Sequence, residues 1–454
     1  MPTTRSPGTA AQQAAVLAGL VLLTMGASSP RRFTFHKDVE PILQARCQSC
    51  HRAGELAPMA LMTYAQVRPW AKAIKAAVAT RRMPPWFADP AVGCFSNDPR
   101  LGENEVRTVA DWVNQGAPEG NVRDAPPAVA FQNGWTVQPD LIVEMPKPVT
   151  VPASGTVNYK YVLVKTSFAS DLWVAASEMR AGNPKVLHHG KVWVRPPGSR
   201  WMEKAVPGES YEHETQGDWI GHNIVGDRNE IVGKFNPGLN PQRYDVEGAG
   251  IFIPKGSDLV FELHYTPAGV PATDASKLGL VLAKTRPNAR YFYSIALANF
   301  ALRIPPRVSS VEVVSEVTVE GPVKLAYVQP HMHLRGKDYE LRLSYPDGRS
   351  ETVFKGKYDF AWQLGYTLTK PIPLPQGTRI TGVAHFDNSA NNPFNPDPSQ
   401  EVRWGAQNWD EMASGFLGLI VNGKTDPERV LRRTGPSAPT MLVKLLETIG
   451  MSAQ

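Results

Sequence analysis

Apolar and polar residues alternate along the chain with two different periods. In W-A-K-A-I-K-A-A-V-A (70–79) and E-N-E-V-R-T-V-A-D-W (103–112) the apolar residues recur at helical spacing, which predicts short amphipathic helices. From Trp135 onward the pattern is that of strands, as in D-L-V-F-E-L-H-Y-T (258–266) and K-L-A-Y-V-Q-P-H-M-H-L (324–334). The chain is therefore predicted to begin with helices and to continue as an all-strand region.

Turn and linker residues divide the chain further. A Pro/Ala-rich stretch around 124–133 separates the two patterns, and turn signals then recur every ten or so residues, which suits sandwiches or barrels. Because about 300 residues of strand are too many for one sandwich, we predict two. The expected fold class is multidomain, with a small all-α domain followed by two antiparallel, jelly-roll-like β-sandwiches. The expected segments are a signal peptide (1–28), the all-α domain (32–122), a linker (123–134), two β-sandwich domains (135–285 and 286–436) and a C-terminal tail (437–454).

The N-terminus has the layout of a secretory signal. Arg5 precedes an apolar run from Ala14 to Leu23 and then small residues, and the run is short for a membrane span. We expect a periplasmic or secreted protein without a stable membrane span after cleavage, although an uncleaved signal anchor stays open. The net charge is +6, but the basic residues are scattered, which argues against binding to nucleic acid.

The stretch R-C-Q-S-C-H (46–51) carries the most specific local motif. Cys47 and Cys50 are spaced to form thioether bonds to a haem, and His51 then lies under the iron as an axial ligand. A zinc site or a redox C-x-x-C pair is the alternative, but no further zinc ligands stand nearby. The motif predicts one covalently bound haem c. It leaves Cys94 unpaired, and we expect that thiol to be buried.

A soft donor is expected on the opposite face of this haem. Met83, in R-R-M-P-P-W, is the predicted ligand because two prolines hold its loop extended, and Met59 and Met62 are rivals. Residues 35–120 resemble small monohaem cytochromes c, through C-Q-S-C-H, M-P-P-W and A-D-W-V-N-Q-G-A-P. The resemblance makes the expected all-α domain a cytochrome c domain, and a His/Met pair implies electron transfer rather than oxygen binding.

Five of the ten histidines lie in three motifs on predicted strands. In P-H-M-H-L the two histidines are two residues apart, so both point to the same face and can share a metal. In K-V-L-H-H-G they are adjacent, and joint ligation requires a strand end, a bulge or different ring nitrogens. The third motif is F-E-L-H-Y-T. Imidazole suits copper and zinc, and an added thioether favours copper.

These motifs resemble those of the ascorbate-dependent type-2 copper monooxygenases, the family of the peptidylglycine α-hydroxylating and dopamine β-monooxygenases. The resemblance spans about residues 135–425 and rests on H-H-G-K-V-W-V, E-L-H-Y-T, P-H-M-H-L-R-G-K and W-G-A-Q-N-W-D-E-M. It implies two antiparallel β-sandwiches and two coppers. The first copper, an electron-storage site, would be held by His188, His189 and His264. The second, where O2 binds and a substrate C–H bond breaks, would be held by His331, His333 and Met412.

Three positions depart from the pattern of the amidating enzyme. Gln329 stands where that enzyme has an arginine for the peptide carboxylate, and Phe416 replaces a tyrosine. Both changes argue against a peptidylglycine substrate. Glu262 replaces a glutamine and lies on the same strand face as His264. It is either a partner of the metal ligands or a solvated carboxylate.

The predicted function is that of an exported haem–copper monooxygenase. It would hydroxylate an unidentified small organic substrate with O2, and a periplasmic donor would supply electrons through the haem and the first copper. Two other classes stay open. One is a non-enzymatic periplasmic redox or copper-binding electron-transfer protein, and the other is an enzyme of another type, such as a reductase or dioxygenase.

Overall fold

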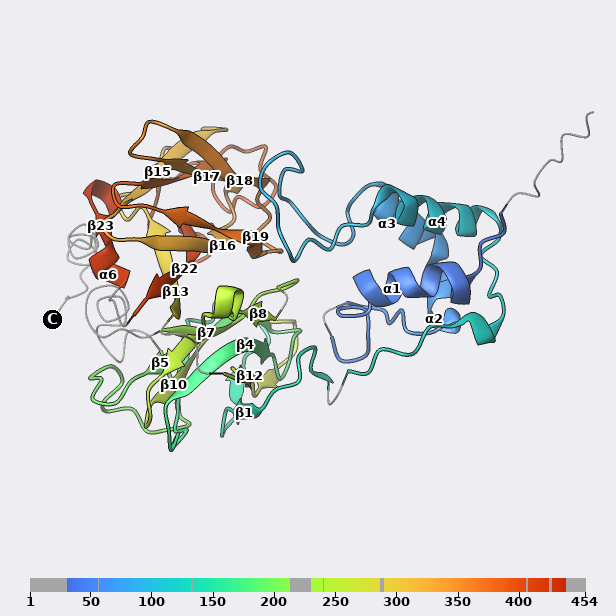
Figure 1. Cartoon of the computed structure of the whole chain (residues 1–454), viewed down its shortest axis with the longest axis horizontal. Helices are drawn as coiled ribbons and strands as arrows, with labels where there is room; N and C mark the ends of the chain where they lie inside the picture. The colour runs from blue at the N-terminus through green and yellow to red at the C-terminus, as the bar shows by residue number, and fades with distance from the viewer. Residues whose placement is uncertain are drawn as a thin grey trace, which may run out of the picture.

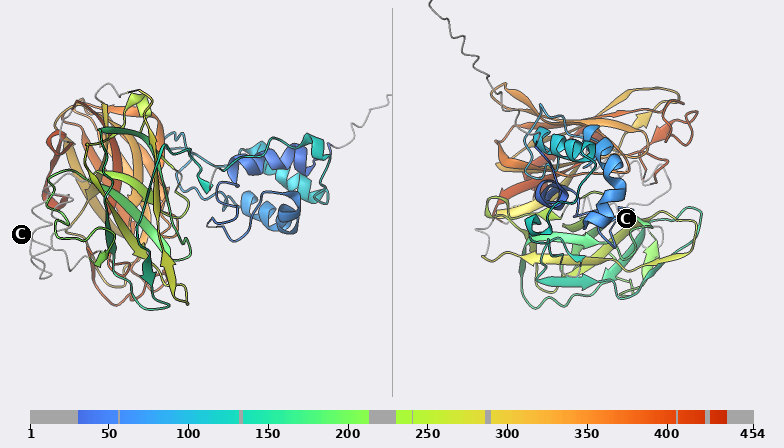
Figure 2. Two further views of the ribbon diagram at one scale, coloured as in Figure 1. Left: turned by 90° about the horizontal axis from the view of Figure 1, so that it is seen from below. Right: turned by 90° about the vertical axis from the view of Figure 1, so that its right-hand side faces the viewer.

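The computed structural model describes residues 31–55, 57–131, 134–212, 230–239, 241–285, 290–405, 407–423 and 427–437. The predicted signal segment and nearly all of the predicted tail lie outside these residues, as does the predicted boundary at 286. A small group of helices stands to one side of a larger body of strands, and two extended segments connect them (Figures 1 and 2).

The helices surround two small apolar clusters. Phe35, Leu43 and Trp112 are buried in one cluster, and Ile42 and Val109 are buried in the other. Helix α4 begins after Gly102, whose N–H donates to the Glu105 carboxylate at 2.7 Å. The helices are a one-turn π-helix (Phe35–Val39), α1 (Glu40–Arg46), α2 (Tyr64–Val67), α3 (Ala71–Ala79), α4 (Glu103–Asn114) and 3-10 turns at Arg68–Trp70 and Val122–Asp124.

Residues 83–102, here called the arm, leave the helices and run onto the strands. Ala88 and Phe95 form isolated β-bridges with Gly356 and Leu368. Trp86 is buried in the apolar core beneath those strands. The arm contains four prolines, which cannot donate backbone hydrogen bonds and so favour an extended path. Cys94 is exposed, so its predicted burial is wrong.

The larger body of strands is here called the β-body, and its first half covers the strands between residues 141 and 282. This half contains two five-stranded antiparallel sheets, one outer and one inner. Their apolar faces share one core, which includes Val192, Phe261 and Leu278. The first outer sheet holds β1 (Leu141–Glu144), β12 (Lys277–Leu282), β4 (Leu172–Arg180), β8 (Gln242–Arg243) and β9 (Ile251–Ile253), and the first inner sheet holds β6 (Ser210–Glu212), β3 (Lys160–Val164), β10 (Asp258–Tyr265), β5 (Leu187–Arg195) and β7 (Ile231–Phe235). A small sheet pairs β2 (Val149–Val151) with β11 (Ala272–Asp274).

The second half repeats this plan with different strands. The second inner sheet holds β13 (Arg290–Ala298), β22 (Ser414–Asn422), β16 (Val323–His331) and β19 (Tyr366–Leu374) in that order. The second outer sheet holds β18 (Ser350–Lys357), β17 (Gly336–Ser344), β20 (Arg379–Phe386), β15 (Val311–Val319) and β23 (Leu431–Arg433). The remaining elements are the pair β14 (Arg303–Ile304) and β21 (Val402–Arg403), helix α6 (Pro427–Val430) and a 3-10 turn (Gly435–Ser437).

The fold class predicted from the sequence is wrong. The described chain is mostly β, and the region expected as an all-α cytochrome c domain contains short helices and the extended arm, whose Trp86 belongs to a β core. The strands do not form two separate jelly-roll-like sandwiches either. Phe292, Ala326 and Ile420 of the second half lie in the apolar cluster of the first, and Gly250 bridges to Tyr291. The helical periodicity identified the helices, but it could not show that the proline-rich segment between them packs against the core of the strands.

Candidate metal centre

Four of the five predicted ligand histidines lie on the inner sheets, on the faces opposite the two apolar cores, and His333 follows two residues after β16 ends. Along β10, Leu263 and Phe261 enter the core of the first half, so His264 and Glu262 point the other way. On β5, His189 lies directly opposite His264 in the register. The alternation of the strands therefore places both histidines on the face that meets the second half.

A β-bulge brings His188 to the same place. His264 pairs with His189, but the next residue, Tyr265, pairs with Leu187, so His188 is the extra residue of β5. A bulge is one of the three arrangements, beside a strand end or the use of different ring nitrogens, that would let adjacent histidines serve one metal. The Nδ1 atoms of His188 and His189 lie 3.1 Å apart, and one ring nitrogen from each of His188, His189 and His264 falls within a 4.8 Å span.

One tyrosine orients two of these imidazoles. The hydroxyl of Tyr159 contacts His189 Nε2 at 2.9 Å, and its ring stacks on His264 with centroids 4.6 Å apart. When His189 Nε2–H donates to that hydroxyl, its Nδ1 keeps a lone pair beside His188. The Nδ1 atom of His264 is buried and has no hydrogen-bond partner among the described residues. One ring nitrogen from each of the three histidines thus lies close to the other two, and the donor set fits a metal ion.

The second set, His331 and His333, presents its Nε2 atoms. His331 ends β16, and its Nδ1–H donates to the Gln363 side-chain oxygen at 2.7 Å. His333 Nδ1–H donates to the Asp410 carbonyl at 3.3 Å, while its Nε2 is buried without a partner in the part of the chain described. Donation of one ring N–H to a fixed acceptor is the usual way in which a metal-binding imidazole is oriented.

A buried carboxylate holds the chain around Met412. Glu411 accepts the backbone N–H groups of His333 (2.8 Å), Arg335 (2.9 Å) and Met412 (3.2 Å). The segment that carries Met412 is thereby tied to the segment that carries His333. Met412 itself is half-buried, two residues before β22 begins. Its position beside His333 fits the predicted third ligand, which stays a prediction because no contact of its sulfur is described.

The two histidine sets form one cluster across the interface of the halves. The ring centroids of His189 and His331 are 6.4 Å apart, and the Phe360 ring packs near both His188 (4.8 Å) and His333 (6.2 Å). Burial lowers the pKa of His264, His331 and His333 to about 3 each. It also lowers the pKa of His188 and His189. The cluster is therefore neutral near pH 7, which is the state that binds metals.

Glu262 is a buried partner rather than a solvated carboxylate. It accepts from Lys191 Nζ at 2.7 Å and from Trp193 Nε1 at 2.9 Å, and it is 1% exposed. Both partners lie on β5, on the face that carries His189. The carboxylate therefore neutralises Lys191 two residues from a predicted metal ligand.

The cysteine motif forms a tight turn after α1. The N–H groups of Cys50 and His51 both donate to the Cys47 carbonyl, at 3.2 and 2.9 Å. Both thiols are free, and burial raises the pKa of Cys47 to about 12. His51 Nδ1–H donates to the Met59 carbonyl at 3.3 Å, which leaves its Nε2 available. Two free thiols beside a histidine held in this way fit covalent attachment and axial ligation of a haem.

The structure separates the three candidate methionines. The Met59 backbone lies on the Nδ1 side of the His51 ring, away from the nitrogen that would bind iron, which weakens this rival. Met83 is half-buried at the start of the arm, and its N–H donates to Ala77. Met62 is also half-buried, and its N–H donates to Gln66. Met83 remains the preferred ligand. Its role stays a prediction, because no described contact joins its sulfur to His51.

The cysteine turn is docked on the end of β4. Glu55 forms ion pairs with Arg180 (2.6 Å) and with Arg52 (3.1 Å). A cavity of about 70 Å³ lies at this junction, and both Cys50 and Met179 line it. Met179 in turn packs on Gly190, where a Cβ would lie 2.5 Å from the Met179 Cε. Met179 therefore lies between the cysteine turn and the strand of His189, since it shares a cavity with Cys50 and packs on Gly190.

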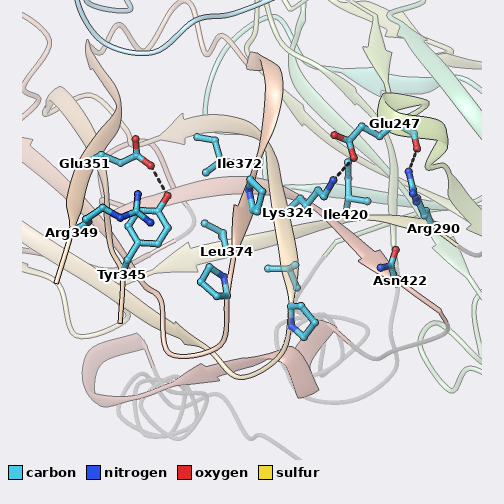
Figure 3. Close-up of a pocket in the computed structure, with 14 residues that line it drawn as sticks. Glu247, Arg290, Lys324, Tyr345, Arg349, Glu351, Ile372, Leu374, Ile420 and Asn422 are labelled. Carbon is cyan, nitrogen blue, oxygen red and sulfur yellow. Dashed lines mark hydrogen bonds and ion pairs between the residues drawn. The ribbon is translucent and has the colours of Figure 1, made fainter. Parts of the chain in front are cut away.

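Two larger cavities lie between the halves. One of about 780 Å³ is lined by Lys324, Arg349 and Glu351 (Figure 3). Lys324 is seven residues before His331 on β16, so this cavity is roughly 23 Å from the cluster at about 3.3 Å per residue. The other, of about 370 Å³, is lined by Lys234 and Tyr327 among others. Tyr327 is only four residues before His331, so this cavity is the nearer one.

Sequence patterns alone missed four residues that shape this centre. Tyr159, Gln363, Glu411 and Lys234 lie far along the chain from the histidines that they approach or support. The strand β7 places Lys234 on one face of the sheet, and Tyr159 directly precedes β3, so these two strands were the available signal. Gln363 lies outside the strands and carries no such signal.

Comparisons with known proteins leave the chain without a family. No family model matches it, and no curated protein matches it. Solved structures with some likeness include the major capsid protein P2 of bacteriophage PM2, with 10% identity, TM-score 0.27 and 63% of this chain and 98% of that chain covered. Another is PNGase F, a glycosylasparaginase from Flavobacterium meningosepticum, with 7% identity, TM-score 0.29 and coverages of 65% and 99%. At such TM-scores the likeness supports no conclusion about fold or function.

A search of the described helices finds none that is long and apolar enough to cross a membrane.

Proposed function

We propose that the chain is a copper-dependent monooxygenase that receives electrons through a covalently attached haem. The observation that carries the proposal is the cluster of five neutral histidines at the interface of the halves, of which four are buried and His188 is half-buried. Its ring nitrogens fall into an Nδ1 set (His188, His189, His264) and an Nε2 set (His331, His333). Imidazole donors with a nearby thioether suit copper.

The reaction adds one oxygen atom of O2 to a C–H bond of a small organic substrate. Its balance is R–H + O2 + 2e⁻ + 2H⁺ → R–OH + H2O, so two electrons must enter in each turnover. Bound copper supplies the one-electron steps and the activation of O2. The residues of the chain keep the imidazoles neutral, orient them through Tyr159, Gln363 and the Asp410 carbonyl, and exclude bulk water.

The haem would make the cytochrome-like region an electron entry point. We propose attachment at Cys47 and Cys50, with His51 and Met83 as axial ligands. The docking of Glu55 on Arg180 and the packing of Met179 on Gly190 support transfer toward His189. We further propose an exported location, where haem attachment through thioethers takes place and a periplasmic donor is available.

Metal content on the whole exported protein tests this proposal. After expression in a host that attaches haem and loading with copper, we expect one haem and two coppers per chain, with type-2 electron paramagnetic resonance signals. Changing His331 and His333 to Ala should leave one copper. The matched control is His385→Ala, because His385 bonds Asp338 on the second outer sheet. A protein that binds haem but no copper would contradict the proposal.

One observation favours a second candidate, a non-enzymatic copper electron carrier. None of the five histidines lines any of the three cavities described above, so those cavities give a substrate no direct access to the cluster. Anaerobic reduction followed by mixing with O2 separates the two. A monooxygenase centre is expected to consume O2 and reoxidise rapidly, whereas an electron carrier should reoxidise slowly until a partner protein is added.

A further inference from the structure

Lys234 is a buried cation for which the inner sheet supplies no carboxylate. Lys234, Lys191 and Glu262 lie side by side across β7, β5 and β10, since Lys234 pairs with Lys191 and Lys191 pairs with Glu262. Glu262 binds Lys191 at 2.7 Å and also accepts from Trp193. The three neighbouring side chains therefore carry two positive charges and one negative charge. No ion pair of Lys234 is found among the described residues.

The surroundings of Lys234 satisfy its ammonium group only in part. Its Nζ donates to Gln329 Oε1 at 3.1 Å and lies 4.5 Å from the centre of the Phe416 ring and 5.6 Å from that of Tyr327. An ammonium group has three donors, and one oxygen acceptor is provided. Burial lowers the pKa of Lys234 to about 7, with Lys191 adding to the effect and Glu230 opposing it. A buried, partly satisfied cation is costly unless an anion joins it.

The cavity of about 370 Å³ provides room for such an anion. It is lined by both halves of the β-body and by the arm. Asn97 of the arm fixes this wall by donating to the Gly365 carbonyl at 2.8 Å and accepting from Thr367 N–H at 2.9 Å. Two basic residues and no acidic one are among the lining residues described. Aromatic rings complete the walls, contributed by Tyr244, Phe292 and Tyr327.

A series of hydrogen bonds connects this cavity to the histidine cluster. Lys234 and the Tyr327 hydroxyl both donate to Gln329 Oε1, each at 3.1 Å. Gln329 Nε2 donates to the Gln363 carbonyl at 3.1 Å, and the Gln363 side chain accepts from His331. A ligand on Lys234 would therefore lie one amide side chain away from the group that orients a predicted copper ligand.

We propose that this cavity binds a small organic carboxylate with an aromatic or apolar body, anchored by Lys234. The inference deepens the proposed function by naming the chemical class of the substrate, and it rests on that function only for the step after binding. The positive lining, the aromatic walls and the single buried ammonium group together favour one carboxylate over a polyanion such as a phosphate ester.

Binding of benzoate to the metal-free, full-length protein tests the proposal without relying on copper. Isothermal titration should show that benzoate binds, whereas benzamide, its neutral isostere, binds much more weakly. Lys234→Met should weaken benzoate binding by roughly 30-fold or more, because truncating one partner of a buried charge pair costs at least about 2 kcal/mol. The matched control is Lys324→Met, which removes a lysine that pairs with Glu247 at the far end of β16.

The proposal is overturned if benzoate does not bind the wild-type protein, if benzamide binds equally well, or if Lys234→Met binds benzoate unchanged. Inorganic phosphate is included as a competing anion, and preference for it over benzoate also overturns the carboxylate class. Lys234→Gln provides a second variant in case the Lys234→Met protein folds poorly. Copper content is measured on a separate, copper-loaded sample of each variant. A variant that no longer binds benzoate but still binds two coppers bears on the carboxylate site and not on the proposed metal centre.

Discussion

Single side chains in this protein control the histidine cluster from a distance along the chain. Gln363 is 32 residues from His331 in sequence, yet its amide oxygen accepts from His331 Nδ1 at 2.7 Å. That contact fixes the tautomer in which Nε2 can bind a metal. Glu411 acts on the backbone instead, because it accepts the N–H of His333 and so holds that residue in position. The chemistry of the cluster therefore depends on acceptors as much as on the histidines themselves.

In the proposed copper protein, changing Gln363 to Leu should weaken the binding of one copper and leave that of the other unchanged. Loss of a partner of this kind typically costs about 10–100-fold in metal affinity. We expect that loss at the His331/His333 position, while the copper on His188, His189 and His264 is unchanged. Competition with a chelator, followed by electron paramagnetic resonance, measures both affinities. Gln400→Leu, on an exposed loop, is the control, and equal weakening of both coppers would contradict the assignment.

The lowered pKa of Lys234 predicts how the free energy of unfolding changes with pH. Because burial lowers its pKa from 10.5 to about 7, the unfolded chain binds more protons than the folded chain between these values, and stability rises with pH across this window. Lys234→Met removes the penalty. It should therefore stabilise the protein more at pH 6 than at pH 9, by roughly 2.7 kcal/mol, because pH 9 lies two units above the pKa of about 7 and each unit contributes about 1.36 kcal/mol. Urea unfolding of both proteins at the two pH values measures this, and a gain independent of pH would contradict it.

At the scale of elements, the strand pattern predicted more than the helix pattern did. The period-2 alternation in 258–266 identified β10 and the face that His264 shares with Glu262, and a bulge was one of the arrangements expected for the adjacent histidines. The pattern could not show that the two histidine sets would meet, because alternation gives a face and not its partner sheet. The arm was missed for a similar reason. Its prolines exclude a helix, but only long-range contacts reveal that Trp86 packs beside Tyr366.

The arm should behave as part of the second β half. Trp86→Ala removes a buried aromatic side chain from that core, and such truncations cost about 3–5 kcal/mol. We expect the loss in the unfolding of the strands, followed by far-ultraviolet circular dichroism at strand wavelengths during urea titration. Trp70→Ala is the matched control, since Trp70 lies among the helices and is 43% exposed. If Trp86→Ala destabilised only the helices, the arm would not be structural for the strands.

At the scale of the whole molecule, the helices are held to the strands by three different connections. The arm contributes bridges at Ala88 and Phe95, residues 122–131 and 134–140 belong to the second connection, and Glu55 pairs with Arg180 beside the cysteine turn. Arg180 also packs its guanidinium near the Trp135 ring at 5.6 Å. These contacts favour a fixed position of the cysteine turn over a freely swinging one, and they place Cys50 on the side that faces β4.

Reversing the charge at this contact should slow electron delivery to copper. Glu55→Arg replaces the carboxylate that pairs with both Arg52 and Arg180 by a third cation. The cysteine turn should therefore separate from β4, and the proposed copper should stay oxidised longer after the haem is reduced. Stopped-flow absorbance follows the haem, and freeze-quench electron paramagnetic resonance follows the copper. The exchanged pair, Glu55→Arg with Arg180→Glu, restores opposite charges and should recover part of the rate. Glu103→Arg, at an exposed ion pair with Arg81 on the same group of helices, is the control. If Glu55→Arg transfers electrons as fast as the wild type does, the route from Cys50 to His189 through Met179 is not the one in use, and reduction of copper must come directly from an external donor.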